Sequence, residues 1–216
     1  MWIGVFVTLF GALAGAISVW VLYRLYEPDL PDVEILKEVQ LQQPLRIYSL
    51  DDRLIASIGE ARRNPTPFEN IPEQVAQAFI AAEDARFYEH PGVDYQGILR
   101  AGWQVLRSGG EYGSGGSTIT MQLARNFFLS PERRIERKLK EIMLSLRIEH
   151  ALSKQEILAL YLNKIFFGHR AYGVSAAAEV YYGKTLEELT LAESAMIAGL
   201  PKAPSDLNPV QNPARA

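Results

Sequence analysis

Glu83 is the residue of this sequence whose position best suits a general base. The segment PEQVAQAFIAAEDARFYEH at residues 72–90 has helical spacing, and the stripe that it predicts consists of Ala76, Ile80, Glu83, Phe87 and His90. A carboxylate among apolar side chains is poorly solvated, which makes it a better base. The alternative is a glutamate at the edge of the core that pairs with a cation such as Arg86.

A second chemical signal is the glycine-rich segment SGGEYGSGGS at residues 108–117, which runs directly into the helical-looking STITMQLARN. Free backbone N–H groups at the start of a helix bind anions, and the helix dipole favours negative charge there. No Gly-Lys-Ser/Thr follows, so the segment is not a P-loop. We therefore predict an anion site at Ser117 and Thr118, with a flexible linker as the alternative.

A third signal is the group of cations around Glu141 in the segment SPERRIERKLKEIMLSLRIEH at residues 130–150. Arg137 and Lys138 precede Glu141 by the spacing that brings side chains together on a helix. The apolar face predicted for the same helix consists of Ile135, Leu139, Ile142 and Leu146. A solvated, ion-paired face is the ordinary interpretation of such a charge pattern. Clustered cations also suit a diphosphate leaving group.

The elements that must position these residues are mostly helices. Helical spacing extends from about residue 70 to 200, and three capping boxes are predicted, at 153–156, 185–188 and 190–193. Ahead of this part, residues 45–58 alternate around two aspartates and predict a short β-hairpin. Three prolines within residues 27–44 predict an extended stalk. The fold class that we expect is mainly α.

Residues 1–26 predict a transmembrane anchor. No charged residue occurs between Trp2 and Tyr23, and as a helix this stretch would be roughly 33 Å long, against about 30 Å for the apolar core of a bilayer. A cleaved signal peptide and a buried helix are the alternatives, although no basic region precedes the apolar run. The flanking charges do not decide the orientation.

Composition excludes several classes of function. The chain has 216 residues with 25 acidic and 22 basic side chains, so no strong basic field attracts nucleic acid. Because cysteine is absent, disulfide scaffolds, thiolate metal sites and cysteine nucleophiles are excluded. Three widely spaced histidines leave little for a histidine-based metal site.

Five ordered motifs give the sequence a resemblance to the bacterial peptidoglycan glycosyltransferase family, which includes the N-terminal domain of class A penicillin-binding proteins. The motifs are EDARFYEHPG at 83–92, GSTITMQLARN at 116–126, RKLKE at 137–141, ILALYLN at 157–163, and LAE with GLPKAP within 191–204. The resemblance covers residues 45–213 and is most similar to the bifunctional Gram-negative type. Arg125 stands where members of the family often have lysine, and both residues are cations.

The resemblance implies a lysozyme-like glycosyltransferase domain at residues 45–213 that polymerises lipid II. It places the domain on the periplasmic side of the bacterial inner membrane, behind a single-pass anchor. The growing glycan chain would be the donor, the 4-hydroxyl of lipid II would attack, and undecaprenyl diphosphate would leave with inversion. Moenomycin is the implied inhibitor, and activators from the cell-wall synthesis machinery are partners that the resemblance leaves open. Nucleic acid is not an expected partner.

By the same resemblance, Glu83 is the base and Glu141 supports the diphosphate of the donor. The residues expected to bind substrate are Asp84, Ser117, Thr118, Gln122, Arg125, Asn126, Arg137 and Lys138. The glycine-rich segment would act as a flap over the cleft. No cofactor is expected to be required, and a divalent cation, Mg or Mn, at the diphosphate is left open.

Two other functions fit parts of the pattern. A lysozyme-like glycan hydrolase or lytic enzyme also uses carboxylates, but its leaving group carries no diphosphate that would need the cations. A non-catalytic membrane-anchored scaffold has no need of Glu83 or Glu141, and both are present. No serine is followed by lysine at the third position, so we expect no penicillin-reactive transpeptidase domain in this chain.

Overall fold

The computed structural model describes residues 2–39, 45–58, 62–107, 116–130, 135–210 and 212–213. It is mainly helical, as predicted. The α-helices are α1 (Trp2–Tyr26), α2 (Glu73–Glu83), α3 (Tyr95–Arg107), α4 (Ile119–Phe128), α5 (Ile135–Ala151), α6 (Lys154–Lys164), α7 (Val174–Tyr182) and α8 (Leu191–Gly199). The strands are β1 (Leu45–Tyr48), β2 (Leu54–Ile58), β3 (Arg62–Arg63) and β4 (Ala171–Tyr172). Short 3-10 helices lie at Glu27–Asp29, Glu34–Glu38, Phe68–Asn70 and Leu200–Lys202.

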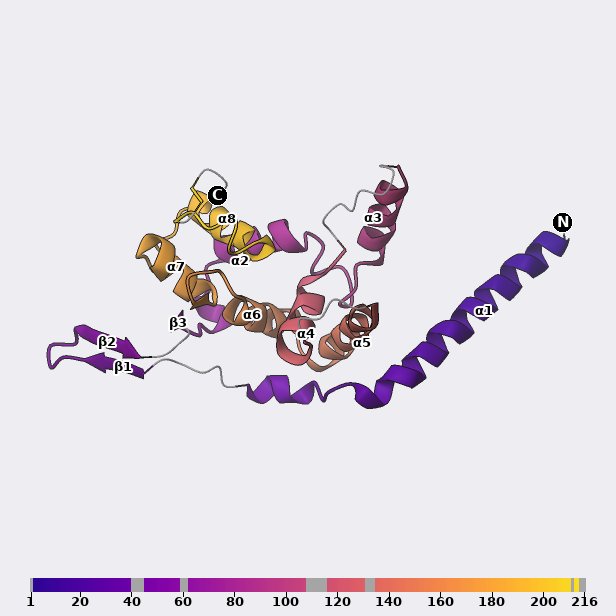
Figure 1. Cartoon of the computed structure of the whole chain (residues 1–216), viewed down its shortest axis with the longest axis horizontal. Coiled ribbons are helices and arrows are strands. Elements are labelled where there is room, and N and C mark those ends of the chain that lie inside the picture. Colours follow the sequence, from indigo (N-terminus) through magenta and orange to yellow (C-terminus); the bar gives the residue numbers. More distant parts are fainter. Residues whose placement is uncertain are drawn as a thin grey trace.

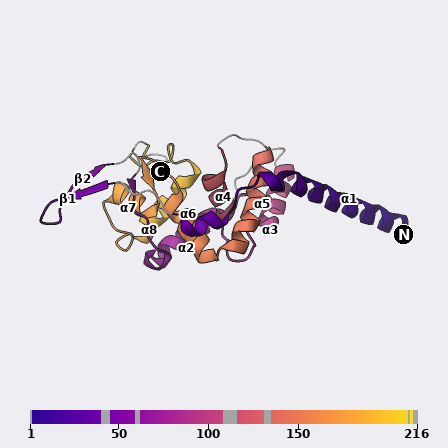
Figure 2. The same ribbon diagram turned by 90° about the horizontal axis from the view of Figure 1, so that it is seen from below.

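Helices α2 and α4 to α8 form one body, and α1 and the β1–β2 hairpin extend from its opposite ends in both views (Figures 1 and 2). Within the body, α2 packs against α8, and α4 packs against both α5 and α6. The apolar core includes three aromatic side chains in edge-to-face contact, because Phe79 meets both Tyr161 and Phe167 with ring centroids 6.4 and 5.7 Å apart. All three side chains are fully buried.

The helix predicted over residues 72–90 is shorter in the structure. It ends at Glu83, and Asp84 leaves the helical conformation with φ −160° while its N–H still bonds to the carbonyl of Ile80. Phe87 and His90 are buried, as the stripe predicted, but they lie on turns beyond the helix. The helix stops here because the Asp84 carboxylate accepts the N–H of Ile119 at 3.0 Å and therefore faces the start of α4.

Side chains cap the helices that follow. Thr118 caps α4 by accepting the N–H of Met121, so the predicted helix start is confirmed. Two of the three predicted capping boxes are confirmed, at Ser153 for α6 and Thr190 for α8. The third was wrong as a helix start, because Thr185 precedes a turn, although its N–H donates to Glu188 at 2.9 Å. Residues 108–115, which hold most of the predicted flap, lie outside the described residues.

The face that α5 buries differs from the predicted one. Leu146 is exposed and Ile142 is half-buried, whereas Leu144, Ser145 and Ile148 are buried together with Glu141. The apolar pattern misled here because the ion-paired side of the helix, which includes Glu141, turns inward. The side for which a solvated face was the ordinary interpretation is therefore partly buried, at Glu141 and Ser145.

The predicted extended stalk is a packed segment in the structure. Residues 27–39 form two 3-10 helices instead of an extended chain, and Val33 and Leu36 are buried in the same core as the helical body. Two contacts tie the junction of α1 and this segment to α5: Arg147 pairs with Glu27 at 3.5 Å, and the Lys140 ammonium lies 5.7 Å from the ring centre of Tyr26, the last residue of α1. Residues 40–44 lie outside the described residues.

The transmembrane helix predicted for residues 1–26 is not supported by the structure. Across the described residues, none of the helices combines the length and the apolar character needed to cross a membrane. Helix α1 does cover Trp2–Tyr26, and several of its large apolar side chains are exposed, among them Phe10, Leu13, Trp20 and Leu25.

The predicted hairpin is confirmed. Strands β1 and β2 pair antiparallel with Leu45 opposite Ile58, and the register shifts at Tyr48. A second pairing was not predicted: β3 lies parallel to β4, so that Arg63 pairs with Tyr172. This pairing connects the start of the domain to the chain between α6 and α7.

At Gly92, the turn after α2 lies close to α5. The φ of this glycine is +91°, and a Cβ there would lie 2.8 Å from the carbonyl oxygen of Ser145. We expect Gly92→Ala to lower the free energy of unfolding by about 1–3 kcal/mol from overlap, in addition to backbone strain. Gly183→Ala is the matched control, because its φ is also positive, +63°, with no atom within 4 Å of the added Cβ. Equal losses in urea unfolding of the two variants would contradict the close approach to α5.

Candidate active site

Glu83 occupies the last position of α2, half-buried, with its carboxylate directed at α4. The amide Nε2 of Gln122 donates a hydrogen bond to Glu83 Oε2 at 2.7 Å. On the other side of this amide, the hydroxyl of Tyr161 donates to Gln122 Oε1 at 3.4 Å. The predicted base, Glu83, therefore accepts a hydrogen bond from Gln122 of α4, and Gln122 is itself held by Tyr161 of α6.

Tyr161 lies among the charges of the site although its side chain is fully buried. Burial raises the pKa of its phenol well above the usual value, and the negative charges of Glu83 and Asp84 act in the same direction, whereas Arg125 opposes them. The phenol is therefore protonated at neutral pH and acts as a hydrogen-bond donor.

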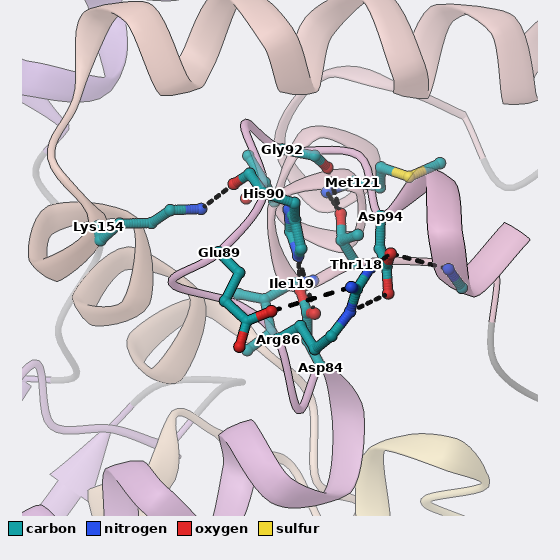
Figure 3. A network of polar contacts seen from close by, with 12 residues as sticks. Asp84, Arg86, Glu89, His90, Gly92, Asp94, Thr118, Ile119, Met121 and Lys154 are labelled. Carbon is teal, nitrogen blue, oxygen red and sulfur yellow. Dashed lines mark hydrogen bonds and ion pairs between the residues drawn. The ribbon is translucent and has the colours of Figure 1, made fainter.

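Asp84 is a buried junction between the turn after α2 and the start of α4 (Figure 3). Its carboxylate lies 2.9 Å from His90 Nε2 and accepts the N–H of Ile119 at 3.0 Å. The neighbouring Thr118 hydroxyl donates to the carbonyl of Gly92 at 2.5 Å while it accepts from Met121. A carboxylate at a helix start is favoured by the dipole of the helix. Asp84 and Thr118 thus bind protein groups, and their predicted contact with substrate stays a prediction.

Two cationic side chains, Lys154 and Arg86, make contacts at the turn that follows α2 (Figure 3). The Lys154 ammonium donates to the carbonyl of His90 at 2.7 Å and lies 4.4 Å from the ring centre of Phe87. Arg86 pairs with Asp94. Burial acts to raise the pKa of Asp94, but the hydrogen bonds from Arg86 and from the backbone of Gly97 outweigh it and hold this pKa below its usual value.

Glu141 lies at the centre of the predicted cation cluster and is buried, with an exposed fraction of 2%. One carboxylate oxygen lies 3.1 Å from Arg137 Nε, and the other lies 3.1 Å from Lys138 Nζ. Lys138 also donates to the Ser117 hydroxyl at 2.7 Å. Ser117 immediately precedes the N-cap of α4, so this cluster and the Glu83 carboxylate are attached to the same helix.

Residues 51–216 match the family described as Transglycosylase. The chain belongs to this family. Penicillin-binding protein 1A of Escherichia coli (strain K12) is 60% identical over 204 residues, which are 94% of this chain and 24% of the relative. Penicillin-binding protein 1A of Vibrio cholerae is 53% identical over 94% of this chain and 25% of the relative.

The chain spans about a quarter of the length of the curated relatives that it matches. Among solved structures, a crystal structure of penicillin-binding protein 1A from Haemophilus influenzae is 36% identical. The alignment covers 82% of this chain and 17% of that chain, with a TM-score of 0.43.

In this transglycosylase, the predicted site residues fall into two linked groups. The first contains Glu83 and Gln122, and the second contains Ser117, Arg137, Lys138 and Glu141. Asp84 and Thr118 lie between the groups at the start of α4. Arg125 is half-buried within electrostatic reach of Tyr161, and Asn126 is exposed on α4.

Three residues near the predicted site, Tyr161, Lys154 and Glu149, were given no role in it from the sequence. Tyr161 contacts Gln122 at 3.4 Å, whereas Lys154 contacts the carbonyl of His90. Glu149 accepts from both Thr120 and Lys154, at 2.6 and 2.8 Å. Tyr161 had two signals: it falls within the motif at 157–163, and it lies on the buried stripe of α6, where a phenol usually needs a hydrogen-bond partner. Lys154 gave no signal beyond its place next to the N-cap of α6.

The described residues do not offer a fitting ligand set for a resident divalent cation at Glu141. Both oxygens of this carboxylate already face cations, Arg137 and Lys138. Within the described ranges, no group of three or more acidic or histidine side chains is arranged to hold a metal ion. The divalent cation therefore stays a prediction for the substrate diphosphate, and no step below uses it.

Replacing Glu141 tests how strongly the cation cluster depends on its carboxylate. We expect Glu141→Gln to lower the free energy of unfolding by about 1.5–3 kcal/mol, because two charge-assisted contacts of a buried group are lost. Glu136→Gln on the same helix is the matched control, since Glu136 pairs with Lys140 at 2.9 Å but is 45% exposed. This control should change the stability by less than about 0.5 kcal/mol. Similar losses in thermal unfolding would show that Glu141 is not the anchor of the cluster.

Proposed function

We propose that this transglycosylase is a peptidoglycan glycosyltransferase that polymerises lipid II into β-1,4-linked glycan strands. The observation that carries the proposal is the attachment of two different chemical groups to one helix. Gln122 of α4 holds the Glu83 carboxylate, and Ser117 at the start of α4 holds Lys138 of the cation cluster. A base and a stabiliser of a diphosphate are what a displacement at a glycosyl diphosphate needs.

In the proposed step, Glu83 removes the proton from the 4-hydroxyl of the incoming lipid II. The oxygen attacks C1 of the donor sugar, and the new glycosidic bond forms as the bond from C1 to the diphosphate oxygen breaks. The electron pair leaves with undecaprenyl diphosphate, so a single displacement inverts the configuration from α to β. The hydrogen bond from Gln122 supports this role because it fixes one oxygen of Glu83.

The departing diphosphate is assigned to the cation cluster. Arg137 and Lys138 are partly exposed, with 22% and 42% of their side chains accessible, so they can meet a ligand while Glu141 stays buried beneath them. Arginine suits phosphate through bidentate hydrogen bonding, and lysine through its point charge. Glu141 then acts from behind, by holding both cations in place. Arg125 and Asn126 remain proposed substrate contacts along α4.

The cations also separate this function from a glycan hydrolase. A glycosidase pairs two carboxylates across the bond to be cleaved, and its leaving group is a sugar hydroxyl that needs no cation. Here the second carboxylate, Glu141, is buried and neutralised by Arg137 and Lys138. This arrangement favours transfer from a diphosphate over hydrolysis.

We also propose that α1 attaches the domain to the inner membrane, with the catalytic body on the periplasmic side. The substrate carries a lipid, and the sequence between Trp2 and Tyr23 has no charge. The exposed side chains of Phe10, Trp20 and Leu25 support contact with lipid. Retention of the chain in washed membranes, with its body open to protease from the periplasmic side, is the measurement that tests this attachment.

The direct experiment incubates the detergent-solubilised chain with labelled lipid II, with and without moenomycin, and separates the products on a gel. A moenomycin-sensitive ladder of long glycans supports the polymerase. Short products made from preformed glycan would support a hydrolase instead. Lipid II left unchanged by folded protein would contradict the proposal for this chain.

Glu83→Gln tests the assignment of the base. We expect the variant to keep the fold and lose at least about a hundredfold in kcat, because general base catalysis typically contributes that much. Glu89→Gln is the matched control, since Glu89 is a carboxylate of the same turn with 67% of its side chain exposed. The control should turn over lipid II at the wild-type rate. Near-native turnover by Glu83→Gln would remove Glu83 from the role of base.

A further inference from the structure

Tyr161 has no role in the proposed mechanism, although its hydroxyl contacts Gln122, which in turn bonds to Glu83. Its ring fills the core and meets Phe79 edge to face at 6.4 Å. A phenylalanine would make the same contact. The hydroxyl is therefore the part of the side chain that packing does not explain, and a buried hydroxyl is costly unless it is hydrogen-bonded.

The hydroxyl group reaches the Glu83 carboxylate through one intermediate group. It donates to Gln122 Oε1 at 3.4 Å, and Nε2 of the same amide donates to Glu83 Oε2 at 2.7 Å. The three residues come from three different helices, α6, α4 and α2. Tyr161 is fully buried and Gln122 has an exposed fraction of 8%, so bulk water competes little for these bonds.

The direction of each bond follows from the chemistry of the amide. A glutamine amide has an accepting oxygen on one side and a donating nitrogen on the other. If the amide were flipped, its oxygen would face the negatively charged Glu83. In the orientation observed, each contact joins a donor to an acceptor, and the phenol occupies the oxygen side. Tyr161 thus favours the orientation that presents N–H to Glu83.

We propose that Tyr161 is a positioning residue for the transglycosylase reaction, which acts through Gln122 to hold Glu83 in the orientation that accepts the proton. This inference rests on the proposed function, because it takes Glu83 to be the base. A carboxylate whose second oxygen is fixed keeps its first oxygen free for the acceptor hydroxyl. Gln122, predicted as a substrate contact, is by this inference the middle member of the relay.

Tyr161→Phe tests the proposal, because it keeps the ring and removes the hydroxyl. We expect kcat with lipid II to fall about three- to tenfold, which corresponds to the loss of one ordinary hydrogen bond in the transition state, while KM stays within about twofold. The KM should hold because Tyr161 is buried behind the site and touches no substrate.

Tyr181→Phe is the matched control. The Tyr181 hydroxyl donates to the carbonyl of Phe167 at 2.7 Å and accepts from Asn208 at 3.2 Å, with no link to Glu83 among the described contacts. Since its donated bond is shorter than that of Tyr161, Tyr181→Phe should lower the melting temperature at least as much. Its kcat should stay at the wild-type value. Stability and turnover would then rank the two variants in opposite orders, which a purely structural role of Tyr161 does not predict.

A double-variant cycle tests the path through Gln122. Gln122→Met keeps the volume of the side chain and removes the amide, so we expect a loss of kcat larger than that of Tyr161→Phe. Adding Tyr161→Phe to Gln122→Met should then change kcat by less than about twofold, because the relay is already broken. Equal effects of Tyr161→Phe in both backgrounds would overturn the relay.

The results separate this proposal from the function on which it rests. No polymer from wild-type protein would contradict the proposed function before any variant is compared. Active wild-type protein with the same kcat for Tyr161→Phe and Tyr181→Phe would overturn the positioning role and leave the function intact. Each variant is assayed below its own melting temperature, measured by circular dichroism, so that a loss of fold is not counted as a loss of turnover.

Discussion

The rest of the site depends on one buried carboxylate, that of Asp84. It ends α2 directly after Glu83, accepts the first N–H of α4 at Ile119, and lies against His90. A single anion thereby sets where the base stands relative to the helix that carries Gln122. Removing an anion that is partnered in this way leaves several donors unsatisfied at once, which makes such junctions expensive to change.

Helix α4 positions both the predicted base and the cation cluster. Its start holds Ser117 against Lys138, and its middle holds Gln122 against Glu83. The base and the cations therefore keep their separation through the backbone of one helix that packs against both α5 and α6. Regular secondary structure holds reacting groups more accurately than a loop does, which suits a displacement with defined geometry.

The sequence predicted what depends on local patterns. The hairpin, the caps of α4, α6 and α8, and the pairing of Glu141 with Arg137 and Lys138 follow from spacing along the chain. The end of α2 could not be predicted from local spacing, because it is fixed by a contact between Asp84 and Ile119, 35 positions later. The relay behind Glu83 was missed for the same reason, and the inward side of α5 was misjudged because ion pairs there replace apolar packing.

The packed segment at residues 27–39 has a practical consequence for where this domain can be divided. A chain shortened to residue 45, where the hairpin starts, would lose Val33 and Leu36 from the core together with the contact between Glu27 and Arg147. The apolar surface uncovered on the body would then favour aggregation. A shortened form for crystallisation or screening is therefore best begun ahead of Glu27, so that the hydrophobic core remains whole.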